Sequence, residues 1–330
     1  MSMKRYVAVR TIQTAVLLML ILTFLFMLFR LIPGSIADQM IFQGASPEAV
    51  AAFEEQWGLN DPLHVQYYHY LVNMAQLDPG TSLHYRKPVL DYVKLKMFNT
   101  FILVAPGVTA GYLLGTSLGT IMGIKRDSLL EKYGIFPIVG VGTTPSFFLA
   151  IIGVIIFAGW LGLVPTSGMI TPQVALEMGE DAPWWKIYTT GDFLWHYVLP
   201  FSVIAIKYMY EPLLIMRTSV VEMAGQDFLH YHKLTGLPKA RWIRHLGKHA
   251  IIPIITFYPI SLGRAISGLV LIEIVFNWPG IGNALVEAVL QSDYPVIQFV
   301  FFLTAAFVVV GNYVVDIVYG MIDPRISIAD

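Results

Sequence analysis

Histidines and basic side chains gather in one internal stretch, residues 227–253, which reads "DFLHYHKLTGLPKARWIRHLGKHAIIP". His230, His232, His245 and His249 lie in it, and a spacing of four brings the last two onto one face of a helix. A metal site would need further ligands, but no cluster of carboxylates accompanies these histidines and the chain has no cysteine. We therefore interpret them as histidines of a solvated helix and expect no metal site.

The motifs of common catalytic and nucleotide sites are missing from the sequence. No P-loop occurs, so we do not expect this chain by itself to bind ATP in that way, and no HExxH zinc motif occurs. No apolar run carries a convincing nucleophile and base together, so we expect no enzyme. The formal net charge is −1, which gives no reason to expect nucleic acid as a partner.

A few charged residues interrupt otherwise apolar runs, where charge is costly and usually faces a cavity or a partner. Lys207 and Glu211 are four residues apart and can pair on one helix face, and Asn312 and Asp316 have the same spacing. Arg264 has no acid four residues away, so we expect it to pair with an acidic group of another span. Two interpretations stay open, a polar translocation path and internal pairing that locks the helices together.

The elements that carry these residues are apolar enough for lipid. The chain of 330 residues is 56% hydrophobic and only 13% charged, whereas soluble domains are about a quarter charged. A helix needs about 20 apolar residues to cross the hydrocarbon of a bilayer, where its backbone must satisfy its own hydrogen bonds. The sequence predicts an all-α membrane protein with six transmembrane helices, at about 11–31, 98–123, 134–160, 197–216, 250–274 and 296–320.

The distribution of Lys and Arg predicts the orientation. If the N-terminus is cytoplasmic, 13 of them lie in inner segments and 5 in outer segments, so both termini are expected inside. The first run could instead be a signal peptide cleaved near Ser35-Ile36-Ala37. Its apolar part, residues 12–29, is longer than the usual signal core, and we expect a retained helix.

The basic stretch itself predicts a helix, a turn and a second helix. Asp227 can cap a helix that begins near Phe228, Gly236 suits the left-handed turn that ends it, and Pro238 fits the first turn of the next helix. Such a knob could dock into a groove on a soluble partner, with Phe228 and Tyr231 on one face. It could equally rest on anionic lipid through its basic residues. The residues alone do not decide between docking on a soluble partner and binding to anionic lipid.

Several segments resemble one family of transporters. The pieces "HKLTGL…RHLGKHAIIP", "NDPLHVQYYHYL", "DPGTSLHYRKPVLDYV", "EIVFNWPGIGNALVEAVLQSDYPVIQ" and "DPRI" occur in the order typical of it. They run from about residue 60 to the C-terminus, and the first apolar run also fits. On these motifs the chain resembles the oligopeptide/dipeptide permeases of binding-protein-dependent ABC importers, first of the two permease subunits.

The resemblance implies a type I ABC importer permease fold in the plasma membrane. It implies as partners a second homologous permease subunit, two ATPase subunits and an extracytoplasmic solute-binding protein. No cofactor is expected in this chain, since ATP and Mg would be held by the ATPases. It also implies that residues 217–249 form the coupling loop that the ATPases grip. The docking residues would be Asp227, Phe228, Tyr231, His232, Gly236, Pro238, Arg241 and Arg244.

The domain organisation follows from the apolar runs and the predicted orientation. Residues 1–31 would form an N-terminal transmembrane helix and residues 32–97 an extracytoplasmic loop region. A permease core of five helices would extend over 98–320, with a cytoplasmic tail at 321–330. Trp and Tyr of the outer loops fit either a membrane interface or contact with a soluble partner.

The resemblance places "FNWPGIG" near the outer mouth. Trp278 is therefore a candidate gate residue, beside Lys207, Glu211 and Arg264 as candidates for the path. The alternative is that the segment is only a tight turn, because its Asn, Pro and Gly residues break a helix.

The expected substrate is an oligopeptide. An oligosaccharide or nickel is the alternative within the same importer type. From another class, an ion-driven secondary transporter often shows inverted repeats, and we find no internal repeat in this sequence.

Overall fold

The protein is helical over nearly all the residues that the structure describes. This computed structural model describes residues 3–31, 41, 46–56, 58, 60–179, 182–226, 238–268 and 270–322. Within those ranges no strand occurs, and the only extended pairing is an isolated bridge between Thr81 and Pro88. The all-helical prediction is confirmed for this part of the chain.

Four helical segments in the described part are long and apolar enough to cross a membrane, or up to six if two bent pairs each count as one span. The four are α1 (Met3–Leu31), α5 (Val89–Ile124), α9 with α10 (Gly191–Lys207 and Tyr210–Ala224) and α16 (Tyr294–Ile322). The bent pairs are α6 (Leu129–Thr143) with α7 (Ser146–Gly153) and the π-helical turns Val154–Trp160, and α12 (Lys239–Ala250) with α13 (Ile252–Gly268). All six apolar runs of the sequence are therefore found in helices.

The third run is not the single helix expected over 134–160. α6 and the helix after it are bent by 103° at Thr144 and Pro145. A proline disfavours the helical conformation in the residue before it, and Thr144 is extended, with φ −66° and ψ 139°. The fifth run, 250–274, is found in α13 and α14 (Val270–Val275), and the bend of 49° between α12 and α13 falls at its start.

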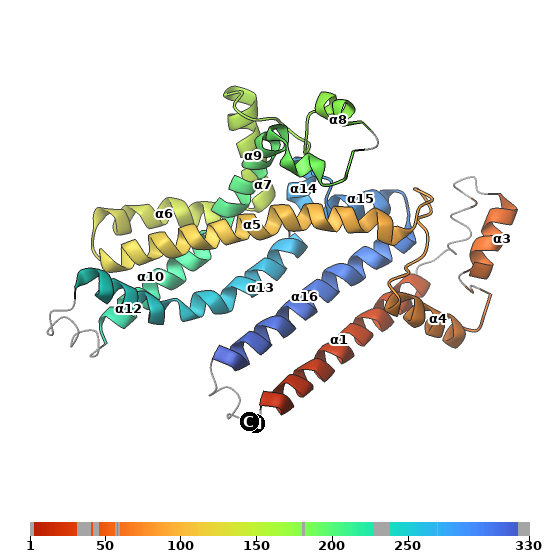
Figure 1. Cartoon of the computed structure of the whole chain (residues 1–330), viewed down its shortest axis with the longest axis horizontal. Coiled ribbons are helices and arrows are strands. Elements are labelled where there is room, and N and C mark those ends of the chain that lie inside the picture. The colour runs from red at the N-terminus through yellow and green to blue at the C-terminus, as the bar shows by residue number, and fades with distance from the viewer. Residues whose placement is uncertain are drawn as a thin grey trace. The chain divides into compact units, whose positions relative to one another are not determined.

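Contacts divide the chain into two compact units, which are described separately. The first comprises Met1–Phe98 and Gly280–Asp330. In it α1 and α16 run antiparallel side by side (Figure 1), with Phe29 against Tyr294 near one end and Thr11 bonded to Tyr313 near the other. The remaining helices of this unit are α3 (Pro47–Gln56), α4 (Leu63–Ala75) and α15 (Ile281–Leu290).

A buried carboxylate fixes the loop before α5 to the start of α16 in this unit. Asp293 is fully buried and accepts hydrogen bonds from the Ser82 hydroxyl and from the backbone N–H groups of Leu83 and His84, the last two at 3.2 Å. Two of the motifs behind the family resemblance, the segments around Ser82 and around Asp293, are thus joined to each other.

The second unit comprises Asn99–Pro279. Its part of α5 packs against α9 and α10 through glycines. An added Cβ at Gly107 would lie 2.7 Å from the Ile204 side chain, and one at Gly111 would lie 2.5 Å from the Ala205 carbonyl oxygen. The glycines that make such close approaches along α5 are Gly107, Gly111, Gly115, Gly119 and Gly123. This contact brings the two backbones close together, as small residues do in membrane helices.

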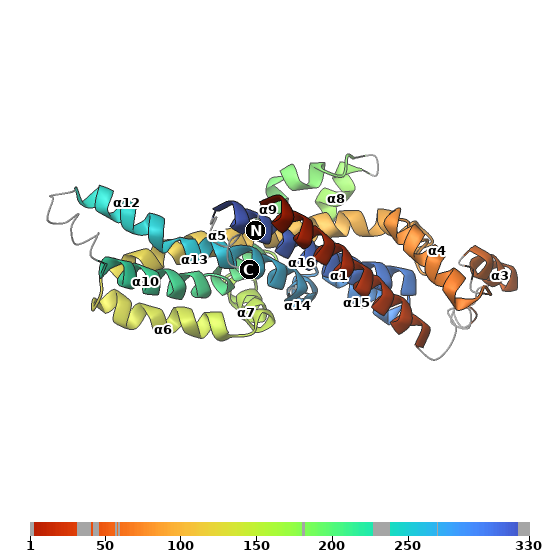
Figure 2. The same ribbon diagram turned by 90° about the horizontal axis from the view of Figure 1, so that it is seen from below.

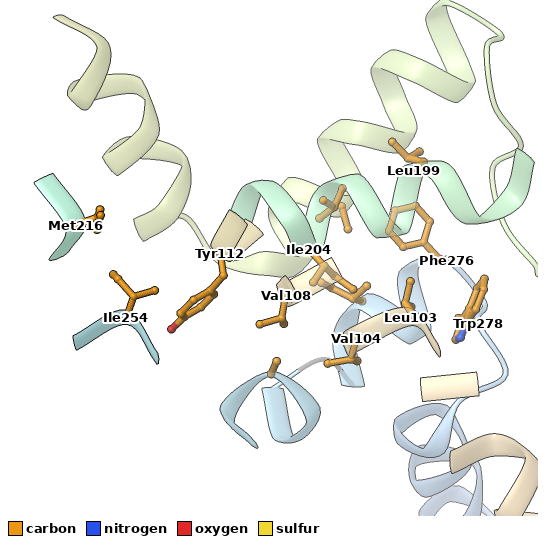
Figure 3. Packing of buried hydrophobic residues seen from close by; sticks show 14 of the residues in the cluster. Leu103, Val104, Val108, Tyr112, Leu199, Ile204, Met216, Ile254, Phe276 and Trp278 are labelled. Atoms are coloured by element: carbon orange, nitrogen blue, oxygen red, sulfur yellow. The ribbon is translucent and has the colours of Figure 1, made fainter. Parts of the chain in front are cut away.

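Apolar side chains fill the space between these helices. Figure 3 shows part of the cluster, in which Leu103, Val108 and Tyr112 of α5 meet residues from α9, α13 and the segment after α14. The second unit also contains α8 (Pro172–Met178) and a short 3₁₀ turn at Lys186–Thr189. Asp192, at the start of α9, holds this region by accepting from the Thr171 N–H at 2.6 Å and from the Thr171 hydroxyl at 2.8 Å.

Candidate functional site

Polar side chains meet within the second unit where α9 ends and α10 begins. The helix is interrupted between Lys207 and Tyr210, so Lys207 and Glu211 do not share one continuous helix. Lys207 Nζ donates to the carbonyl oxygens of Gly142, at 2.5 Å, and Thr144, at 2.7 Å. The expected pairing of Lys207 with Glu211 is therefore wrong, because the ammonium group instead satisfies carbonyls that the end of α6 leaves open.

Glu211 pairs with Arg264 of α13. Arg264 Nη1 lies 3.4 Å from Glu211 Oε1, with the two side chains 58% and 30% exposed. Glu211 also accepts from the hydroxyls of Tyr210, at 3.2 Å, and Ser261, at 3.3 Å. The acid that Arg264 needed from another span is thus Glu211, and this ion pair is partly open rather than sealed in the core.

Tyrosines extend the polar cluster across α5 to α13. Tyr112 donates to the Ser261 hydroxyl at 2.6 Å, and Tyr258 is bonded to Thr109 with 2.7 Å between their oxygens. The rings of Tyr112 and Tyr258 meet edge to face, with centroids 5.1 Å apart. These residues were not predicted from the sequence, since a hydroxyl in an apolar run carries no charge that marks it. Their spacing offers one signal, because Thr109 and Tyr112 are three residues apart and so are Tyr258 and Ser261.

Trp278 is fully buried in the core of the second unit (Figure 3). Its Nε1 donates to the Asn99 carbonyl oxygen at 2.9 Å, and Asn99 Nδ2 donates to the Pro279 carbonyl oxygen at 2.9 Å. Tyr188 donates its hydroxyl hydrogen to Asn99 Oδ1. The preceding residue, Asn277, has φ +47°, which is the left-handed conformation of a tight turn. Burial and these hydrogen bonds fix the position of the Trp278 side chain beside the turn.

The expected contact between Asn312 and Asp316 is replaced by contacts to α1 in the first unit. Asp316 Oδ2 lies 3.4 Å from Arg10 Nη1, and the backbone oxygen of Asp316 accepts from the Tyr6 hydroxyl at 3.1 Å. These bonds join the beginning of α1 to the end of α16, which supports the interpretation that this charge locks helices together.

Five of the predicted docking residues lie outside the described part of the chain: Asp227, Phe228, Tyr231, His232 and Gly236. The other three can be placed. Pro238 immediately precedes α12, consistent with a second helix beginning near it, and Arg241 and Arg244 are exposed on α12. Leu246 and Ala250 are buried, so α12 has one packed face and one basic face.

Comparison with known proteins covers the whole of this architecture. Residues 98–328 match the family described as the binding-protein-dependent transport system inner membrane component. Residues 3–97 match the N-terminal family of the same membrane components. The chain belongs to this family of transport permeases. It is therefore a multi-pass component of the cell membrane and a permease subunit of an ATP-driven importer.

Three named relatives cover almost all of the permease. The dipeptide transport system permease protein DppB of Alkalihalophilus pseudofirmus is 32% identical, over 92% of this chain and 93% of its own length. The oligopeptide transport system permease protein AppB of Bacillus subtilis is 30% identical, over 98% of this chain and 100% of its own. The glutathione transport system permease protein GsiC of Salmonella typhimurium is 28% identical, over 98% and 99%.

The permease's described residues include no group of three or more His, Asp or Glu side chains able to hold a metal ion. The polar cluster of Glu211, Arg264 and the tyrosines is held together by hydrogen bonds and one ion pair.

Proposed function

We propose that this permease imports peptides, together with a second homologous permease subunit, two ATPase subunits that use ATP and Mg, and an extracytoplasmic solute-binding protein. The observation that carries the proposal is the near full-length similarity to three permeases named for dipeptide, oligopeptide and glutathione transport. These names favour a peptide over the oligosaccharide or nickel that the importer type also admits. Membership of this family favours an ATP-driven importer over an ion-driven secondary transporter.

The proposed topology has six spans and cytoplasmic termini. In it α6 and the helix after it count as one span and α13 belongs to another, and the excess of Lys and Arg in the inner segments supports the orientation. In this arrangement 32–97 is extracytoplasmic, 98–320 is the permease core and 321–330 is a cytoplasmic tail. α12, with its exposed basic face, then lies on the cytoplasmic side as part of the coupling loop 217–249.

Docking of the ATPases is proposed to depend mainly on Phe228 and Tyr231. Buried aromatic anchors contribute more to an interface than charges at its rim, so Arg241 and Arg244 are assigned a supporting role. Replacing Phe228 and Tyr231 together with alanine is expected to abolish ATP-dependent peptide uptake in proteoliposomes that contain the full complex and its binding protein. Replacing the exposed Lys248 with alanine is the matched control and is expected to leave uptake within about twofold, as for a rim charge. A double variant that still transports at the control rate would refute the docking assignment.

The translocation path is proposed to pass the Glu211–Arg264 pair. An exposed arginine in a membrane helix is costly unless it faces water or a polar partner. The gate role expected for Trp278 stays a prediction, and its complete burial gives that role no support.

Cysteine labelling tests the path. The chain has no cysteine, so Arg264→Cys gives it a single thiol, whose labelling is followed on this subunit. It is expected to react with a water-soluble maleimide in the assembled complex and to be protected by ATP and vanadate, as the path changes access. A control, Phe257→Cys, places a thiol at an exposed apolar position of the same helix. If the thiol at 264 reacts no faster than the one at 257, and no state changes its rate, Arg264 does not face the path.

A further inference from the structure

The start of α6 is tied to α10 by a buried acid. Glu131 lies in the first turn of α6 and is only 6% exposed. Its Oε1 accepts two hydrogen bonds from Arg217 of α10, with Arg217 Nε at 2.8 Å, and its Oε2 accepts from the Asp127 N–H at 2.5 Å. Ser128 caps the same helix by accepting from the Glu131 N–H at 3.3 Å. Glu131 therefore closes a capping arrangement and forms an ion pair with a neighbouring helix at the same time.

The other end of α6 is tied to the junction of α9 and α10. Lys207 donates to the carbonyl oxygens of Gly142 and Thr144, which are left open where α6 stops. Gly142 is buried, and a Cβ there would collide with the ring of Tyr210. The last turn of α6 thus contacts an ammonium group and an aromatic ring that belong to one neighbouring arm, residues 207–210.

Both attachments have the favourable electrostatic sense. An acid at the N-terminus and a cation at the C-terminus of a helix each stabilise its dipole. The middle of α6 has a different character, since Tyr133 and Phe136 are 60% and 73% exposed. α6 contacts both α9 and α10, and the two views of the ribbon show these three helices (Figure 1, Figure 2). α6 is therefore fastened to a single arm, α9–α10, at its two ends.

We propose that α6 and the α9–α10 arm form one rigid lever, which carries movement of the coupling loop to the bend at Thr144 and Pro145. The proposal rests on the proposed function, since α10 leads in sequence to the loop on which the ATPases would act. Glu131, Arg217 and Lys207 are positioning residues in it. Glu131 is buried and the Arg217 side chain is 34% exposed, so removing Arg217 leaves a buried carboxylate without its partner, and the two residues act as a unit. The glycine contacts of α5, which reach Arg217 and Val220 at Gly123, support the same arm from its other side.

Distances between spin labels test the rigidity. In this cysteine-free chain, Phe136→Cys and Thr218→Cys place labels at exposed positions of α6 and α10. The full complex in liposomes is measured at rest and after trapping with ATP and vanadate. The distance distribution between the labels is expected to be the same in both states. A shift of its maximum on trapping would overturn the proposal, because a rigid lever keeps this distance constant.

A variant that opens the clamp completes the test. Glu131→Gln in the labelled chain is expected to broaden the 136–218 distribution, and to lower the uptake per ATP hydrolysed by about tenfold while ATP hydrolysis itself continues. Lys132→Gln is the matched control, an exposed charge one residue further on, and is expected to change neither quantity. The conservative Arg217→Lys keeps the charge and is expected to give an intermediate coupling ratio.

The possible failures are distinguishable. If the unaltered complex takes up no peptide with ATP, the proposed function fails. If it transports and Glu131→Gln behaves like Lys132→Gln, the lever is wrong and the function stands. Should Glu131→Gln fail to assemble, Lys207→Gln tests the other end of α6 with the same two readouts, and a normal coupling ratio there would also overturn the lever.

Discussion

Replacing Gly115 with leucine is expected to prevent the permease from folding, the largest effect anticipated for any single change in the second unit. An added Cβ at this position would collide with the Met209 carbonyl oxygen and would lie 2.8 Å from the Pro212 side chain. Backbone atoms of α10 cannot turn aside as a flexible side chain can. Overpacking of this kind costs about 3 kcal/mol or more where helices must separate. The measurement is the yield of monodisperse protein in detergent and its melting temperature.

Gly140 provides the matched control for this change. It is also a helical glycine, in α6, but nothing lies within 4 Å of the position that its Cβ would take. Gly140→Leu is therefore expected to give protein with nearly unaltered yield and melting temperature. Equal behaviour of Gly115→Leu and Gly140→Leu would show that α5 does not approach α9–α10 as closely as the structure indicates.

The five glycines of α5 recur every four residues, and that regularity is visible in the sequence without any structure. The helix at 98–123 was predicted from its apolar length alone, without use of this glycine spacing. With a spacing of four, each glycine lies close to the next on the helix surface, so the five form a continuous stripe that winds slowly along the helix and predicts a close helix–helix contact. What the sequence does not reveal is the partner, since the carbonyls of α9 and α10 that face these glycines carry no mark of their own.

Apolar runs predicted the helices well, because hydrophobic length is a property of each segment alone. The break at Thr144 could also have been predicted from the sequence, since Pro145 restricts the backbone of the residue before it. The pairing of charges was not. Lys207 and Glu211 have helical spacing, but that spacing joins two side chains only where the helix is continuous, and here it stops at Lys207. Arg264 and Glu211 are 53 residues apart, so their contact depends on how α10 and α13 pack.

The coupling loop marks a different limit. Its docking role comes from resemblance and from the capping pattern around Asp227, Gly236 and Pro238, and the structure tests it only through α12. The motif around Asp293 is the opposite case. Resemblance alone drew attention to it, and the structure supplies the physical reason, a buried carboxylate surrounded by donors.

Replacing Asp293 with alanine is expected to destabilise the first unit by about 3 kcal/mol, because one buried and two partly buried donors lose their acceptor together. The donors are the Ser82 hydroxyl and the N–H groups of Leu83 and His84. Asp293→Asn is expected to be less damaging, since its amide oxygen still accepts, while its NH₂ group faces donors and cannot pair with them. The melting temperature of the purified permease in detergent measures both effects.

Asp91 is the matched control for the carboxylate at 293. It lies in the same unit but is 57% exposed, and its partner is Lys94 at 2.6 Å on the same helix. A pair of this kind contributes about 0.5 kcal/mol, so Asp91→Ala is expected to melt nearly as the unaltered protein does. If Asp293→Ala melts with Asp91→Ala, the loop at 82–84 does not depend on this carboxylate. A large difference between them would instead show that the loop before α5 is held in place from the start of α16.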